Sequence, residues 1–161
     1  AIAACDKAIA ANPKDADSYS NRGYSWSVKG DQDRAIADFN AALRINPDFA
    51  SAYGNRGSAY ADRGDLTRAI ADYTRAIELD EEYSNAYNNR GNLYRQQRRY
   101  DLAIADFTAA IRINPEYAVA YNNRGRTYQA MGDMTRALDD YEQARRIEPD
   151  NSAYQGFGMR Q

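Results

Sequence analysis

YNNRGNLY, at residues 87–94, is one of four near-copies of the same wording, the others being YSNRGYSW (19–26), YGNRGSAY (53–60) and YNNRGRTY (121–128). Their glycines, at positions 23, 57, 91 and 125, are 34 residues apart. A second repeated segment begins twelve residues after each glycine and reads AIADF (35–39), AIADY (69–73), AIADF (103–107) and ALDDY (137–141). Self-similarity at a fixed period predicts a stack of like units rather than one compact domain.

Each period contains two segments whose apolar residues recur at helical spacing. Tyr53 and Gly57 share one face of a first predicted helix, and Ala69 and Tyr73 share one face of a second. Between the two segments stands a glycine, which suits a left-handed helix end, followed by an aspartate, which can cap the next helix. These glycines are Gly30, Gly64 and Gly132. The third copy has Arg98–Arg99 at this place, so we expect a left-handed arginine there, at a cost of about 1 kcal/mol, and no aspartate cap.

The composition excludes most site chemistry. The chain has 161 residues, with 21 Lys+Arg against 23 Asp+Glu, no histidine and a single cysteine, Cys5. Without histidine there is no Ser–His–Asp triad, no Cys–His pair and no His-containing zinc site, and one cysteine cannot close an internal disulfide. We therefore expect a protein that is not an enzyme and that has no catalytic residues, no metal and no cofactor.

Charge and hydropathy limit the partners in the same way. A net charge of -2 argues against a nucleic-acid platform. No apolar run approaches the roughly 20 residues of a membrane span, so we expect no membrane insertion. The sequence thus favours a soluble protein of the cytoplasm or the periplasm, with a protein or peptide as its partner.

The repeated pattern has an aromatic residue, a glycine four residues on and an aromatic three residues later, and it continues with alanine, an aromatic, alanine and proline. In this it resembles the tetratricopeptide repeat family, and the wording is most similar to bacterial members. The resemblance covers almost the whole chain. It implies an all-α fold, a right-handed superhelical solenoid of antiparallel helix pairs, with a concave groove built from the first helices.

The resemblance also implies a division of the chain into repeats within one solenoid domain. The lone segment at 1–15 corresponds to the second helix of a truncated repeat, so we interpret the chain as a fragment of a longer protein. Four complete repeats follow at 16–49, 50–83, 84–117 and 118–151. We expect 152–161, which carries a faint echo of the repeat, to form a C-terminal cap or a frayed tail.

The family resemblance places a row of asparagines along the groove, one from each first helix. An asparagine amide offers a donor and an acceptor to a peptide unit, whatever side chain that unit carries, although it can equally bond a neighbouring helix. Arg95 and Arg126 would receive a carboxylate or an acidic side chain, so we expect the main binding locus at residues 85–129. The predicted groove residues are Asn21, Tyr24, Asn55, Asn85, Asn88, Asn89, Asn92, Arg95, Asn122, Asn123 and Arg126.

Each repeat also carries an arginine before its glycine and an aspartate 16 residues later, on the facing sides of the two helices. A bidentate contact would suit the guanidinium fork, and we interpret these residues as structural ion pairs. The predicted pairs are Arg22–Asp38, Arg56–Asp72, Arg90–Asp106 and Arg124–Asp140.

These features together predict a non-catalytic protein–protein interaction module that binds a peptide segment of a partner. One alternative is a self-assembling scaffold, a homo-oligomer formed through the N-terminal edge, where Ile2, Cys5 and Ile9 share one helix face. A further alternative is an accessory domain of a larger protein. The carboxylate clamp of chaperone-binding family members is absent, because none of the three lysines stands at its positions.

Overall fold

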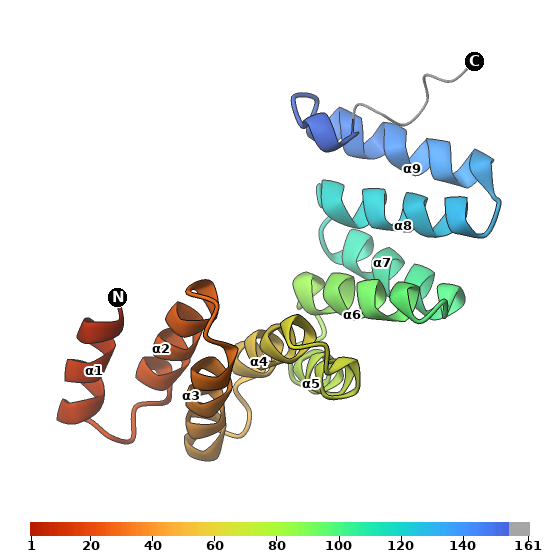
Figure 1. Ribbon diagram of the computed structural model, residues 1–161. Coiled ribbons are helices and arrows are strands. Elements are labelled where there is room, and N and C mark those ends of the chain that lie inside the picture. The colour runs from red at the N-terminus through yellow and green to blue at the C-terminus, as the bar shows by residue number, and fades with distance from the viewer. Residues whose placement is uncertain (155–161) are drawn as a thin grey trace. The chain divides into compact units, whose positions relative to one another are not determined.

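The computed structural model describes residues 1–154, and the regular secondary structure of this part of the chain consists of helices joined by short turns (Figure 1). The chain divides into two compact units, Ala1–Glu81 and Glu82–Gln161, which we call unit 1 and unit 2. Unit 1 contains α1 (Ile2–Ala11), α2 (Ala16–Val28), α3 (Gln32–Ile45), α4 (Ala50–Asp62) and α5 (Leu66–Leu79). Unit 2 contains α6 (Ser84–Gln96), α7 (Tyr100–Ile113), α8 (Ala118–Ala130), α9 (Met134–Ile147) and the short 3-10 helix η1 (Ser152–Tyr154).

Unit 1 is built from helix pairs. The helices α2 and α3 form one antiparallel pair and α4 and α5 the next, while α1 packs on α2 and α3 packs on α4. Ile36 and Phe39 of α3 are buried against Ala59 and are flanked by Trp26 and Tyr60. The second helix of one repeat is therefore covered by the first helix of the following repeat, as expected for a solenoid.

Unit 2 repeats this arrangement with the pairs α6–α7 and α8–α9, which are joined by packing of α7 on α8. Tyr141 of α9 is buried beside Tyr128 and Ala137, with Ile104 packed against them. The helices of the α8–α9 pair approach closely, as the space around Gly125 shows. A Cβ added at this residue would lie only 2.8 Å from Cε1 of Tyr141. Only glycine leaves room for the tyrosine ring at this crossing.

The end of unit 2 is partly covered by η1. Tyr154 is buried against Ala118 and Ala144, with Tyr121 and Ile147 at its margin. The segment expected as a cap or a frayed tail thus begins, at 152–154, as a helical turn with a buried aromatic. The rest of that segment, 155–161, lies outside the described residues.

The turns inside the repeats follow the sequence-based expectation. The glycines of the first, second and fourth repeats have positive φ, and the aspartate after each accepts a hydrogen bond from the backbone N–H three residues on. In the third repeat Arg98 has φ 58°, and Arg99 makes no side-chain cap. The left-handed arginine and the missing cap are both confirmed.

Arg99, which does not cap the helix, makes a cation–π contact at this turn. Elsewhere an arginine of the second helix stacks on an aromatic ring of the first, as Arg136 does over Tyr128 at 4.4 Å from the ring centroid. The third repeat has Leu102 at the position of that arginine. In this repeat Arg99 lies over Tyr94, with its Cζ 4.8 Å from the ring centroid. The cation–π contact is therefore present, and its cation comes from a residue three positions earlier in the chain.

Candidate peptide-binding face

The predicted groove residues of unit 1 stand on its first helices. Asn21 and Tyr24 on α2 are exposed, with 58% of Tyr24 accessible, and Asn55 on α4 is half-buried. Within the described residues neither asparagine side chain has a hydrogen-bond partner in the chain. Unit 1 therefore offers two amides and one aromatic ring to the outside.

In unit 2 the structure corrects two of the predicted groove residues. Asn88 and Asn123 are only 3% and 7% exposed. The Nδ2 group of Asn123 donates to Oδ1 of Asn88 at 3.0 Å, and Nδ2 of Asn88 faces Oδ1 of Asn89 at 3.4 Å. The expectation that these two amides are exposed was wrong, because they stand where α6 and α8 contact each other and there they satisfy one another.

The other polar residues of α6 and α8 form two stripes at helical spacing, which we call the amide face. On α6 the half-buried or exposed members are Asn85, Asn89, Asn92 and Arg95, and on α8 they are Asn122 and Arg126. Asn85 is engaged within the unit, since its Oδ1 accepts a hydrogen bond from the Tyr117 hydroxyl at 2.8 Å. Oδ1 of Asn122 is buried and, within the described residues, has no hydrogen-bond partner.

Arg95 and Arg126 give one end of the amide face its positive charge. Among residues 1–154 neither arginine has an ion-pair partner. Nη2 of Arg95 reaches only Oδ1 of Asn92, at 3.4 Å, and its Nε is buried without a partner. Burial and then the charge of Arg126 lower the pKa of Arg95.

The hydroxyl of Tyr141 belongs to the same cluster. It donates to Oε1 of Gln129 at 2.7 Å. Burial raises the pKa of Tyr141, and the positive charges of Arg126 and Arg95 oppose that rise. Residues of α6, α8 and α9 thus converge on one electropositive spot, which we call the two-arginine cluster (Arg95, Arg126, Gln129 and Tyr141).

The structure brings each of the four repeat arginines onto its aspartate. In every pair Nε and Nη2 of the arginine donate to the two carboxylate oxygens of the aspartate, at 2.7–2.9 Å. All four aspartates are buried. The bonded aspartate raises the pKa of each arginine, although burial opposes the effect. This is the bidentate geometry that the guanidinium fork favours.

The third nitrogen of these arginines makes a contact that sequence reasoning missed. Nη1 of Arg22 donates to Asp6 at 2.7 Å and Nη1 of Arg56 to Asn40 at 2.6 Å. Nη1 of Arg124 likewise donates to Thr108 at 3.0 Å. Each acceptor lies on the second helix of the preceding repeat, 16 residues before its arginine. Each of these arginines therefore forms hydrogen bonds both within its own repeat and with the preceding one. The signal was present, because positions 6, 40 and 108 fall on the 34-residue period and all carry an acceptor.

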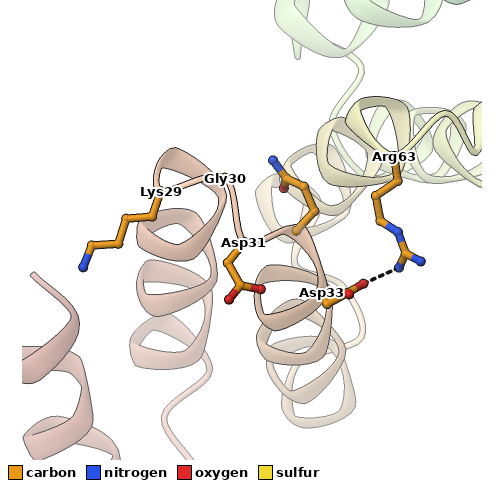
Figure 2. Close-up of a pocket in the computed structure, with 6 residues that line it drawn as sticks. Lys29, Gly30, Asp31, Asp33 and Arg63 are labelled. Atoms are coloured by element: carbon orange, nitrogen blue, oxygen red, sulfur yellow. Dashed lines mark ion pairs between the residues drawn. The ribbon is translucent and has the colours of Figure 1, made fainter.

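The turns of unit 1 contain a polar hollow lined by Lys29, Gly30, Asp31, Gln32, Asp33 and Arg63. Figure 2 shows Arg63 reaching Asp33, with Nη1 and Oδ1 2.7 Å apart, while Lys29 extends away from this pair. The lining has two positive and two negative side chains, so the hollow has no net charge to attract a charged ligand. No group of acidic or cysteine side chains among the described residues is arranged to hold a metal ion.

The tetratricopeptide repeat profile matches residues 84–117 and 118–151, and a second profile, described as TPR repeat, matches 29–62 and 57–97. The chain belongs to the tetratricopeptide repeat family. It is accordingly a protein–protein interaction module with an all-α solenoid fold, of a family whose repeats typically serve as non-enzymatic scaffolds for protein partners. No helix in residues 1–154 combines the length and the apolar character that crossing a membrane requires.

Solved structures resemble the chain closely. A crystal structure of MamA matches with a TM-score of 0.83 and 27% identity over 95% of this chain and 90% of that one. A second MamA structure matches with a TM-score of 0.80 and 27% identity over 96% and 84%. A structure of pilF from Pseudomonas aeruginosa has the same fold, with a TM-score of 0.81 at 22% identity over 86% and 64%. No curated protein sequence matches the chain.

Proposed function

We propose that the amide face of unit 2 binds a peptide segment of a protein partner. The observation that carries this proposal concerns unsatisfied polar atoms. Among the described residues three buried side-chain atoms lack a hydrogen-bond partner, and two of them, Nε of Arg95 and Oδ1 of Asn122, belong to the amide face. A buried polar atom left unpaired costs about 1–3 kcal/mol, so the Arg95 and Asn122 side chains gain free energy when they turn outward and pair with a bound segment.

The chemistry of the face suits a peptide backbone. The half-buried amides of Asn89 and Asn92 each present a donor and an acceptor, which matches the N–H and C=O of an extended segment. Arg95 and Arg126 receive an acidic group of that segment. In unit 1 the exposed Asn21 and the half-buried Asn55 offer the same backbone chemistry, and Tyr24 offers a ring on which a side chain can stack.

The test begins with peptides selected from a random display library on the immobilised protein. Hydrogen–deuterium exchange on a selected complex should show protection concentrated in α6 and α8. Changing Asn89, Asn92 and Arg126 together to Ala should abolish binding while the circular dichroism of the chain stays unchanged. A control triple of exposed residues, Asp101→Ala, Arg112→Ala and Asp139→Ala, should bind as the parent does. Protection elsewhere, or full binding by the first triple, would refute the proposed site.

A self-assembling scaffold is a second candidate, favoured by the exposure of α1. None of the residues of α1 is buried. Ala8 is exposed, whereas its counterparts 34, 68, 102 and 136 residues later, Ala42, Ala76, Ala110 and Ala144, are completely buried. The face of Ala8 and Cys5 would then contact a second copy of the chain. Multi-angle light scattering over a range of concentrations tests this, since a strict monomer excludes it and a dimer that Ala8→Glu dissociates supports it.

A further inference from the structure

The two-arginine cluster has more positive charge than a single carboxylate neutralises. Arg95 and Arg126 lie on neighbouring first helices, and no acidic side chain among residues 1–154 pairs with either of them. Arg95 is half-buried, so solvent screens its charge less than it screens an exposed arginine. A monoanionic ligand would leave one positive charge uncompensated at this place, whereas a dianion would compensate both.

The donors of the cluster suit a group with several oxygens. The Nη2 group of Arg95 makes only the 3.4 Å contact with Asn92, and the buried Nε–H, which has no partner among the described residues, becomes available when the half-buried side chain turns toward a ligand. The Arg126 side chain is exposed and free to rotate onto a ligand. The Tyr141 ring is fixed by its contact with Gly125, so its hydroxyl stays at the base of the cluster. Two guanidinium forks can engage three oxygens at once, which is the arrangement typical of phosphate recognition.

We propose that Arg95 and Arg126 bind a phosphomonoester, carried as phosphoserine or phosphothreonine on the peptide segment that occupies the amide face. This inference rests on the proposed function and specifies the acidic group of that ligand. A phosphomonoester carries about -1.5 to -2 charges at pH 7, which matches the two arginines. The chain would then capture its partner in response to phosphorylation.

The pH dependence distinguishes this ligand from a carboxylate. The charged and titratable side chains around the cluster are Arg95 on α6, Tyr100 on α7, Arg126 on α8, and Tyr141 and Asp140 on α9. Both carboxylate oxygens of Asp140 accept hydrogen bonds from Arg124, and an ordinary aspartate is already ionised well below pH 5. Arginine and tyrosine do not titrate near pH 6, and the chain contains no histidine. The second ionisation of a phosphomonoester lies near pH 6. Any change in affinity between pH 5 and 7.5 therefore belongs to the ligand.

The experiment compares three short peptides by isothermal titration calorimetry, with phosphoserine, glutamate or serine between two alanines and with both termini blocked. At pH 7.5 the phosphoserine peptide should bind at least about tenfold more tightly than the glutamate peptide. At pH 5, where the phosphate is monoanionic, the difference should largely disappear. The Nε–H signal of Arg95 in a ¹⁵N-correlated NMR spectrum should shift with the phosphoserine peptide and stay in place with the serine peptide.

Matched variants locate the effect. Arg126→Gln should abolish the preference for phosphate while leaving the circular dichroism unchanged. Arg112→Gln, which removes one exposed charge of α7 in the same unit, should retain that preference. Equal affinity for the phosphoserine and glutamate peptides, or equal losses in the two variants, would overturn the inference.

Two further outcomes separate the inference from the proposed function. Inorganic phosphate that binds as tightly as the phosphoserine peptide would show that the ligand is a free phosphate, and it would refute the peptide-borne group. Library peptides that protect α6 and α8 without any preference for phosphate would leave the proposed function intact and refute this inference alone.

Discussion

Unit 1 and unit 2 share their framework and differ on their outward faces. Both hold a bidentate arginine–aspartate pair with a buried aspartate between the helices of each repeat, and both place a glycine against an aromatic ring at each crossing. At the two positions that carry Arg95 and Arg126, however, unit 1 has no charged residue. The residues of unit 1 at the repeat position of Arg95 are Ser27 and Ala61. Those at the repeat position of Arg126 are Tyr24 and Ser58.

The comparison separates the positions that hold the helices together from those that form the outward face. Framework positions have the same residue type in every repeat, because each must make the same contact with the neighbouring helix. Most face positions, such as those of Arg95 and Arg126, vary from repeat to repeat, although the position of Asn21, Asn55, Asn89 and Asn123 does not. The face of unit 2 departs from that of unit 1 by two arginines without an ion-pair partner among the described residues, and it is there that we propose a partner binds.

The largest expected effect concerns the shared framework. Asp72→Ala in unit 1 and Asp140→Ala in unit 2 should each lower the free energy of unfolding by about 3 kcal/mol, the lower end of the range for a buried pair, because each leaves two donors of a half-buried arginine unpaired. In unit 2 the double variant Arg124→Met, Asp140→Leu should be destabilised less than Asp140→Ala alone. Urea unfolding followed by circular dichroism measures these differences. Additive losses in a double-mutant cycle on Arg124 and Asp140 would contradict the pairing.

The next largest effect concerns how tightly the two helices of a repeat pack at the glycine, which differs between the units. A Cβ at Gly125 would lie 2.8 Å from the Tyr141 ring, whereas one at Gly57 would lie 3.1 Å from the Tyr73 ring. Gly125→Ala should therefore destabilise the chain by about 1–3 kcal/mol through overpacking, and Gly57→Ala by less. Urea midpoints of the two variants provide the comparison. A larger loss at Gly57 would show that the α4–α5 crossing yields less readily than the α8–α9 crossing.

A smaller effect is expected at the turn that only unit 2 has altered. Arg98→Gly should raise the free energy of unfolding by about 1 kcal/mol, because glycine tolerates the positive φ of this position. The matched reverse change in unit 1, Gly64→Ala, should lower it by a similar amount, since Gly64 has φ 79°. Thermal unfolding of both variants checks the signs. Destabilisation by Arg98→Gly would mean that the arginine makes a contact worth more than the strain.

The smallest effect is expected when the two arginines of unit 2 are reproduced in unit 1 and binding of the phosphoserine peptide is measured. Ser27→Arg with Ser58→Arg places two arginines in unit 1 at the positions equivalent to Arg95 and Arg126, beside Tyr73, whose hydroxyl lies 2.9 Å from Ser58 Oγ. The double variant should gain a second, weaker site for the phosphoserine peptide, of about millimolar affinity. Calorimetric stoichiometry with the native site removed by Arg126→Gln measures the gain. No binding by this variant would show that two arginines alone are insufficient.

Much of this molecule was predictable from the sequence because a periodic chain supplies its own comparison. The helix pairs, the bidentate contact of Arg124 with Asp140 and the left-handed Arg98 all follow from reading one repeat against the others. The pairing of Asn88 with Asn123 could not be predicted, because it depends on how closely α6 approaches α8. Periodicity gives the position of a side chain on its helix and does not give the separation between helices.

The cation–π contact of the third repeat was missed for a related reason. Leu102 stands where the other repeats have arginine, so a comparison of equivalent positions gives no sign of the contact. Arg99 restores it from three residues earlier because a guanidinium on a long, flexible stem can reach the same ring from a different Cα. Sequence comparison aligns backbone positions, whereas the contact depends on where the end of the side chain arrives.

The Nη1 contacts of Arg22, Arg56 and Arg124 have a consequence for the way such a chain lengthens. The joint between consecutive repeats accepts an aspartate, an asparagine or a threonine opposite the same arginine. Any repeat can therefore follow any other without loss of this bond, and a duplicated or reordered repeat meets compatible groups on both sides. A duplicated repeat would therefore keep this hydrogen bond at its new joint while bringing a different outward face.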